Sequence, residues 1–85
     1  MKTMHCEIVT PEKVVLREEA EFIVAPGHEG ELGILPGHTR LMSGLVKGSV
    51  FLVKGQERKG FAIDTGFIHI VPTGVKIFAP AVRLE

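Results

Sequence analysis

Three features of the sequence predict an all-β fold, a two-sheet antiparallel β-sandwich of about nine or ten short strands. Glycine and proline, ten and five of the 85 residues, recur at short intervals along the whole chain. The segments between them are rich in Val, Ile and Phe, which favour strands. Few of these segments are long enough for a three-turn helix. Many short strands separated by turn signals are typical of a sandwich or barrel.

The first third of the chain is expected to form three strands. Pro11 ends the first, because proline lacks the N–H that a strand ladder needs. The charged run 17–19 separates the second and third and is expected to be a solvated turn or a strand edge, where charge discourages stray pairing. The three expected strands are 5–10, 14–17 and 21–25.

The densest turn signal lies between residues 26 and 38. Glycines stand at 27, 30, 33 and 37, and prolines at 26 and 36, so this path must bend tightly around one short strand, 32–35. We expect three apolar side chains of this strand to point inward, namely those of Leu32, Ile34 and Leu35. We expect four polar ones to face outward, namely those of His28, Glu29, Glu31 and His38.

The remainder of the chain is divided by the turn signals Lys47-Gly48, Lys54-Gly55, Thr65-Gly66 and Pro72-Thr73-Gly74. A lone aspartate, Asp64, is expected to cap one of these turns. His69 alternates with Phe67 and Val71 and is expected to be a packed strand histidine. The five expected strands are 39–43, 49–53, 59–63, 67–71 and 75–79.

Several expected strands are apolar on both faces, whereas an antiparallel sheet with one wet face should alternate. The clearest cases are 22–24, 50–53 and 67–71. Two interpretations are open. Strand twist and loops cover the excess within the chain, or part of one outer face is covered by a partner, because contiguous exposed apolar patches mark interfaces.

Length and composition restrict the function classes. Eighty-five residues with 45% hydrophobic side chains fit one globular domain, residues 1–85. The formal net charge is zero and there is no Trp or Tyr, which argues against a nucleic-acid partner. Cys6 is the only cysteine, so it forms no internal disulfide and is expected to be a small buried side chain. We expect no signal peptide, and no apolar run reaches the roughly 18–20 residues of a membrane span.

No catalytic, cofactor or metal motif is present in the sequence. Without a Gly-Lys pair there is no phosphate-binding loop, and the glycines do not form Gly-x-Gly-x-x-Gly. Ser43, Ser49 and Cys6 are in expected strands without the flanking groups that nucleophilic catalysis requires. The side chains of residues 28, 29, 31 and 38 are metal-ligand types, but their spacing matches no ligand motif. We therefore expect no enzymatic activity, no cofactor and no metal.

The order Pro-Gly-x-Glu-Gly-Glu-Leu-Gly-Ile-Leu-Pro-Gly-His at 26–38 resembles the signature of the epsilon subunit of the F-type ATP synthase, called delta in mitochondria. The resemblance spans roughly residues 5 to 79. Its other segments are 7–12, 39–45, 47–48, 61–63, 66–68 and 75–77. It implies two packed antiparallel sheets in a non-catalytic central-stalk rotor subunit that joins the gamma subunit to the ring of c subunits.

By this resemblance, two sets of residues are expected to bind partners. The polar loops of the c-ring are expected to contact His28, Glu29, Gly30 and Glu31. The gamma subunit is expected to contact His38, Met42 and Ser43. The resemblance also implies coupling of ion-driven rotation to ATP synthesis, at the cytoplasmic face of the bacterial inner membrane or its organellar equivalent, with the membrane reached only through the complex.

The sequence departs from the family at its C-terminal side. The family usually continues into a helical hairpin, whereas this sequence reaches Ala79-Pro80-Ala81 and ends at Glu85, so no such hairpin is expected here. Two alternatives remain open. One is a free-standing β-sandwich interaction module or homo-oligomer that uses the same apolar face. The other is a small metal-binding or ligand-binding protein built on the His/Glu loop.

Overall fold

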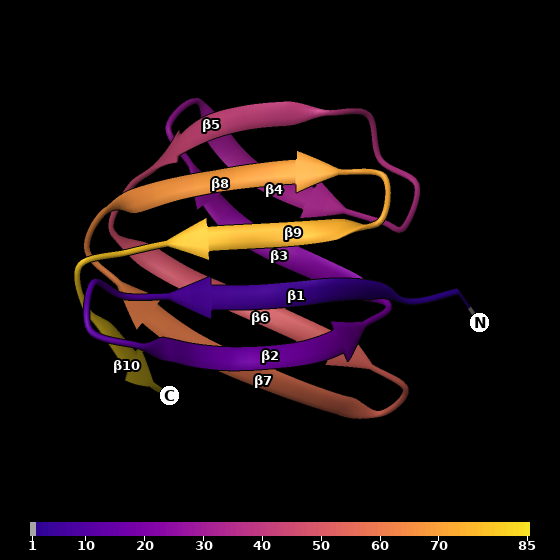
Figure 1. The fold of residues 1–85 in the computed structure, drawn as a ribbon, viewed down its shortest axis with the longest axis horizontal. Helices are drawn as coiled ribbons and strands as arrows, with labels where there is room; N and C mark the ends of the chain where they lie inside the picture. Colours follow the sequence, from indigo (N-terminus) through magenta and orange to yellow (C-terminus); the bar gives the residue numbers. More distant parts are fainter. Residues whose placement is uncertain (1) are drawn as a thin grey trace.

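The computed structural model describes residues 2–85, which form ten β-strands without a helix (Figure 1). The strand count and the fold class agree with the sequence prediction. The strands are β1 Met4–Val9, β2 Val14–Ala20, β3 Phe22–Gly27, β4 Gly30–Ile34, β5 Leu41–Leu45, β6 Gly48–Lys54, β7 Glu57–Ile63, β8 Gly66–Val71, β9 Gly74–Phe78 and β10 Val82–Leu84.

The strands lie in two layers (Figure 1). The front layer has the order β5-β8-β9-β1-β2, and the back layer has the order β4-β3-β6-β7-β10. The layers are joined at one corner, where Gly27 of β3 is opposite Leu45 of β5. The His28 N–H donates to the Gly44 carbonyl at 2.9 Å, and the Val46 N–H donates to the Pro26 carbonyl at 2.9 Å. The sandwich is therefore one bent sheet that is nearly barrel-shaped.

One pairing differs from a purely antiparallel sandwich. The N-terminal strand β1 lies between β9 and β2, antiparallel to β2 but parallel to β9, with Cys6 opposite Val75. A parallel neighbour needs a long crossover, and almost the whole chain separates these two strands. No local sequence signal could indicate this pairing.

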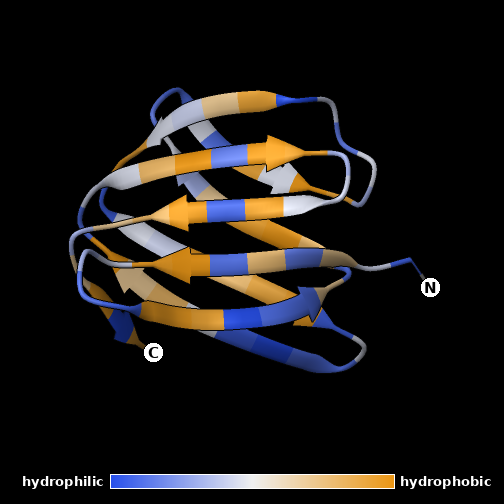
Figure 2. Cartoon of the chain, viewed as in Figure 1, coloured by the Kyte–Doolittle hydropathy of each residue, from blue (hydrophilic) through white to orange (hydrophobic). Residues whose placement is uncertain are grey.

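The core fills the space between the two layers, because every second residue of a strand points inward. Figure 2 shows polar bands between apolar ones along β1, β8 and β9 of the front layer. Isoleucine supplies most of the fully buried volume, at positions 8, 23, 34, 63, 68, 70 and 77. Cys6 is buried among them, as predicted, and burial, reinforced by Glu18 and Glu7, raises the pKa of its thiol to about 12.

The side of the sandwich opposite the corner is closed by an ion pair. The Nζ atom of Lys59 on β7 donates to the Oε2 atom of Glu18 on β2, and this hydrogen bond raises the pKa of Lys59. The charged run 17–19 thus belongs to an edge strand, which agrees with one of the two expectations for it. Charge at this edge leaves little opportunity for another strand to pair there.

Three local predictions were wrong. Leu35 is 59% exposed, because β4 ends at Ile34 and Pro36 turns the chain out of the sheet. His69 is exposed rather than packed, since its neighbours Ile68 and Ile70 take the inward positions. The strand expected at 39–43 begins only at Leu41 and continues to Leu45.

Candidate interaction surfaces

The turn between β3 and β4 presents a compact polar tip. Gly27 is opposite Gly30, so His28 and Glu29 form a two-residue hairpin turn. Gly30 has a φ of +132°, which L side chains rarely adopt, and a Cβ on Gly27 would lie 2.5 Å from the Gly30 carbonyl oxygen. The four residues predicted to meet the c-ring, from His28 to Glu31, are all exposed. Backbone geometry therefore fixes this tip in an outward position.

Two of the three residues predicted to meet gamma lie beside this tip. A hollow of about 580 Å³ is lined on one side by residues 28–32 and on the other by Leu41, Met42, Ser43 and Gly44. His38 is separate and half-buried, beyond the opposite end of β5, with its Nδ1 atom 2.8 Å from the Thr39 carbonyl oxygen. The structure thus brings the four predicted c-ring residues together with Met42 and Ser43, whereas His38 lies apart from them.

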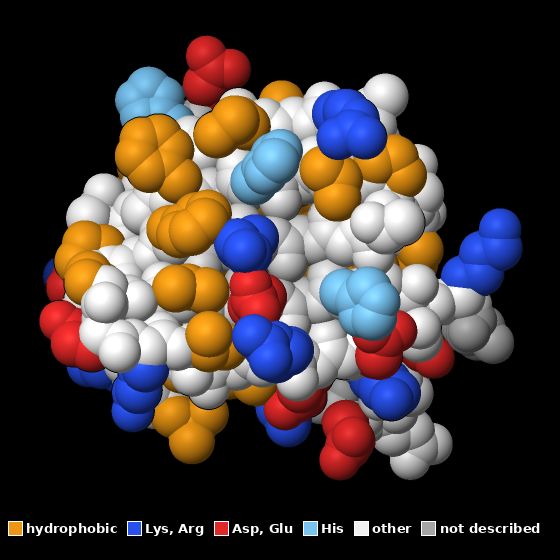
Figure 3. Space-filling model, in the orientation of Figure 1, with side chains coloured by type: hydrophobic (Ala, Val, Ile, Leu, Met, Phe, Trp, Pro, Cys, Tyr) orange, Lys and Arg blue, Asp and Glu red, His pale blue; other side chains and the backbone are white. Residues whose placement is uncertain are grey.

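The outer face of the front layer carries large exposed apolar side chains. Met42 is 68% exposed, Phe67 60% and Phe78 44%, and Phe67 lies directly opposite Phe78 on the neighbouring strand. The two rings border a shallow apolar hollow whose other walls include Val9, Pro11 and Pro80. Figure 3 shows hydrophobic side chains gathered on the left half of this face. We call Met42, Phe67 and Phe78 the apolar flank.

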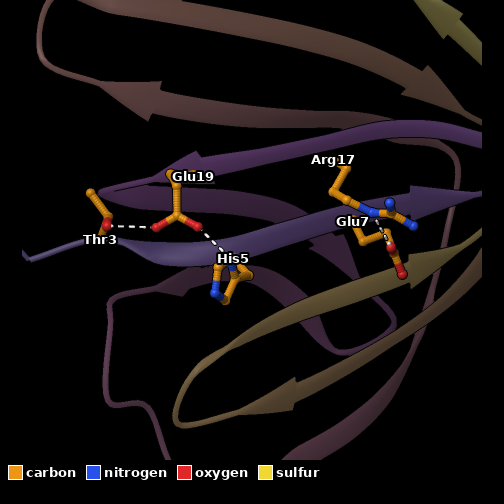
Figure 4. A network of polar contacts seen from close by, with 5 residues as sticks. All are labelled: Thr3, His5, Glu7, Arg17 and Glu19. Atoms are coloured by element: carbon orange, nitrogen blue, oxygen red, sulfur yellow. Dashed lines mark hydrogen bonds and ion pairs between the residues drawn. The ribbon is translucent and has the colours of Figure 1, made fainter.

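The other half of the same face is polar and internally paired. The Nε of Arg17 donates to Glu7 at 2.8 Å, and the Nζ of Lys76 is 3.2 Å from the same carboxylate, which together hold the pKa of Glu7 below its ordinary value. A second cluster joins Glu19 to both Thr3 and His5 (Figure 4). These groups already have partners within the chain, so this half is a less adhesive surface than the apolar flank.

The outer face of the back layer is also apolar in sequence, but the chain covers it itself. The Phe51 ring lies over Gly60, where a Cβ would be only 2.9 Å from it, and the Arg58 guanidinium lies 4.0 Å from the centre of the same ring. The Phe22 ring lies over Gly33 in the same way. The two interpretations of the doubly apolar strands thus apply to different layers. Self-coverage explains the back layer, whereas the front layer remains open.

The hydroxyls of Ser43 and Ser49 donate to different kinds of acceptor. The Ser43 hydroxyl donates to the Gly44 backbone carbonyl at 3.1 Å, and the Ser49 hydroxyl donates to the exposed Glu85 carboxylate at 2.8 Å. Within residues 2–85, no three His, Cys, Asp or Glu side chains are grouped as a metal site would require. Asp64 is close to Arg83, at 3.5 Å, across the β7–β10 edge.

Sequence reasoning missed part of the apolar flank. Phe78 of the flank and Val9 beside it were not predicted to face outward, although each has the same strand parity as an outward-facing polar neighbour, Lys76 for Phe78 and Glu7 for Val9. A period-two reading of 75–79 could have placed Phe78 outward. The pairing of Phe78 with Phe67 follows from register, which the sequence does not show.

No helix in residues 2–85 has the length and apolar character needed to span a membrane.

The fold and these surfaces define a small β-sandwich domain with an open apolar flank on one outer face. Residues 3–84 match the family model described as "ATP synthase, Delta/Epsilon chain, beta-sandwich domain". The chain therefore belongs to this family, which confirms the resemblance seen in the sequence.

Curated relatives named ATP synthase epsilon chain support this membership. The chain is 42% identical to the one from Chloroflexus aurantiacus over 80 residues, which cover 94% of this chain and 58% of the relative. It is 47% identical to the one from Syntrophobacter fumaroxidans over 75 residues, covering 88% and 56%. The chain thus spans somewhat more than half the length of these relatives.

Two solved assemblies contain chains of the same fold. One is the mitochondrial ATP synthase of Euglena gracilis, OSCP/F1/c-ring, with a TM-score of 0.90 at 22% identity over 96% of this chain and 53% of that chain. The other is the central stalk/c-ring of the Tetrahymena thermophila mitochondrial ATP synthase, with a TM-score of 0.78 at 19% identity over 95% and 66%. At these identities the likeness establishes the fold.

Proposed function

We propose that this domain is a non-catalytic part of the rotor of an F-type ATP synthase, which joins the gamma subunit to the c-ring and helps couple ion-driven rotation to ATP synthesis. The observation that carries the proposal is the arrangement of two different adhesive features on one rigid body. These are the acidic tip at 28–31 and the apolar flank beside it. A body that transmits torque between two partners needs two such contacts.

The tip is suited to the polar loops of the c-ring. Within residues 2–85, Glu29 and Glu31 form no ion pair, whereas Glu7, Glu18 and Glu19 each pair with a basic side chain. An exposed carboxylate on a rigid hairpin can pair with a basic or amide group of a partner and so set the register of docking more than its affinity. We assign this role chiefly to Glu31, with His28, Glu29 and Gly30 around it.

The apolar flank is suited to the gamma subunit. Apolar area buried between proteins supplies most of the attraction, and large aromatic side chains contribute most of it. Met42 adds an unbranched side chain that adapts to an irregular contact. Ser43 lies beside it, and His38 extends the contact toward the other end of β5. By this proposal the domain reaches the cytoplasmic face of the membrane only through its partners.

The test compares two charge reversals on the same fold. Glu31→Lys should weaken retention on purified c-rings roughly five- to thirty-fold, because it replaces an attraction of up to about 1 kcal/mol with a repulsion of similar size. Glu12→Lys is the matched control, since Glu12 is an exposed glutamate in the β1–β2 turn. Both variants should melt at the temperature of the unchanged protein, because both side chains are in solvent.

Equal retention of both variants on the rings would refute the assignment of the tip. Failure of the unchanged protein to bind either gamma or the rings, together with concentration-dependent self-association, would favour the homo-oligomer instead. Analytical ultracentrifugation of the isolated domain distinguishes these results.

A further inference from the structure

We propose that the free edge of β5 accepts an extended segment of the gamma subunit, the partner assigned to Met42 on this strand, as an additional strand, with a basic side chain of that segment set against the acidic tip. This inference rests on the proposed function and specifies how one partner is held. It concerns the hollow between β4 and β5, beside the corner that joins the two layers. We call this hollow the β4–β5 seam.

The backbone of Met42 faces this seam. In an antiparallel pair, residues alternate between those that bond their partner and those that point away from it. The Gly44 carbonyl accepts a hydrogen bond from the His28 N–H, so the backbone N–H and C=O of Gly44 point away from β8. Because these directions alternate along a strand, the N–H and C=O of Met42 also point away from β8, whereas those of Leu41 and Ser43 point toward β8. The N–H and C=O of Met42 therefore form the next unfilled step of a ladder that the turn begins at Gly44.

The facing edge of β4 follows the same logic. Pro26 has no N–H, so its pair with Glu31 cannot be one that exchanges two hydrogen bonds. The pair of Gly27 with Gly30 and that of Ala25 with Leu32 must then be the bonded ones. The backbone groups of Glu31 and Gly33 consequently point away from β3, toward the free side of β4. Two unfilled strand edges thus border one hollow.

The edge of β5 also lacks the protection found on the other edges of the described sheet. Edge strands are usually guarded by charge, shortness or cover. The edge strand β2 carries the run Arg17-Glu18-Glu19, and β10 has only three residues, including Arg83. The edge of β4 carries Glu31. The sequence of β5 is Leu-Met-Ser-Gly-Leu, without a charge. An unguarded edge is a template for strand addition.

Side chains around the seam define what the added segment must look like. Leu32 and Leu41 lie on the inner faces of their strands, opposite Ala25 and Ile70, yet Leu41 is 39% exposed and Leu32 only partly buried. An apolar side chain pointing into the seam would cover both. The side chain of the next residue in the added segment would point outward beside Glu29 and Glu31, where a basic group is favoured. The occupant is thus an extended segment with adjacent apolar and basic residues.

The test removes the Met42 N–H without changing much else. Met42→Pro deletes a donor that β8 does not use, and proline is tolerated on edge strands whose N–H faces solvent. Met42→Ala is the matched control, because it shortens the side chain and keeps the N–H. The probe is the gamma–c-ring subcomplex from membranes of the source organism, stripped of this chain. We expect Met42→Pro to bind at least about tenfold more weakly than Met42→Ala.

Amide hydrogen exchange supplies a second readout that needs no variant. In the isolated domain the Met42 amide should exchange much faster than those of Leu41 and Ser43, and binding of the subcomplex should slow it at least about tenfold. Equal binding of the two variants, or an unprotected Met42 amide in the complex, would overturn strand addition while leaving the rotor function intact. Failure of the unchanged domain to bind would refute both. Protection of Met42 by self-association would assign the seam to a second copy instead.

Discussion

Phe67 and Phe51 offer a paired test of which sandwich face binds the gamma subunit. Both are aromatic residues on outer faces, Phe67 on the front layer and Phe51 on the back. Phe67 is 60% exposed, whereas Phe51 is partly covered by Arg58 and packed on Gly60. We expect Phe67→Ser to weaken gamma binding with little change in stability. We expect Phe51→Ser to lower stability with little change in binding.

The magnitudes follow from area. A phenylalanine side chain has roughly 200 Å² to bury, so 60% exposure leaves about 120 Å² for a partner, up to about 3 kcal/mol. Ordering costs reduce this figure, so the loss in affinity should be roughly ten- to a hundred-fold. For Phe51, lost packing and the lost cation–π contact should cost about 2 kcal/mol, or on the order of 10 °C in Tm.

Two assays separate these outcomes. Surface plasmon resonance on immobilised gamma reports affinity, and thermal unfolding followed by circular dichroism reports stability. The reasoning fails if Phe51→Ser weakens gamma binding as much as Phe67→Ser does at a temperature where both remain folded. It also fails if Phe67→Ser melts as early as Phe51→Ser, because the Phe67 ring would then be part of the core.

Two further predictions concern the polar half of the front layer and the turn. The pKa of Glu7 is lowered by Arg17 and Lys76, so the folded protein should lose stability as pH falls from about 4.5 through the folded pKa, and Glu7→Gln should flatten that loss in acid-unfolding curves. A pH profile identical in both proteins would contradict this. Gly27→Ala should lower stability by about 1–3 kcal/mol and weaken c-ring binding, because the new Cβ has no room beside Gly30 and Leu32. Gly33→Ala, which meets only the edge of the Phe22 ring, is its milder control; equal melting of the two would contradict the prediction.

Local patterns predicted most of the strands, because turn residues and apolar runs act over a few residues. They did not predict which strands pair with one another. The parallel contact of β1 with β9 joins segments about seventy residues apart. The alternation of side chains along the strand also gave a wrong prediction for His69. Apolar residues stand on both sides of it in the sequence, so the pattern does not show which of them point inward. Likewise Leu35 continues the apolar pattern of β4, but the chain has already left the sheet there.

The candidate surfaces were partly predictable for the same reason. The glycines around residues 27–31 indicate an exposed bend by themselves, so the acidic tip could be expected. That Met42 borders this tip depends on the corner between β3 and β5, which one residue pair forms. Phe78 joins the flank only through its register with Phe67. Such long-range contacts arise from the packing of the layers and have no local signature.

The most direct test of the account is a cryo-EM structure of this domain bound to the gamma subunit and c-ring of its source organism. The account predicts that Phe67, Phe78 and Met42 lie against gamma, that Glu31 meets the ring, and that Phe51 contacts neither partner. Burial of the back-layer face under gamma, with the apolar flank left in water, would contradict it.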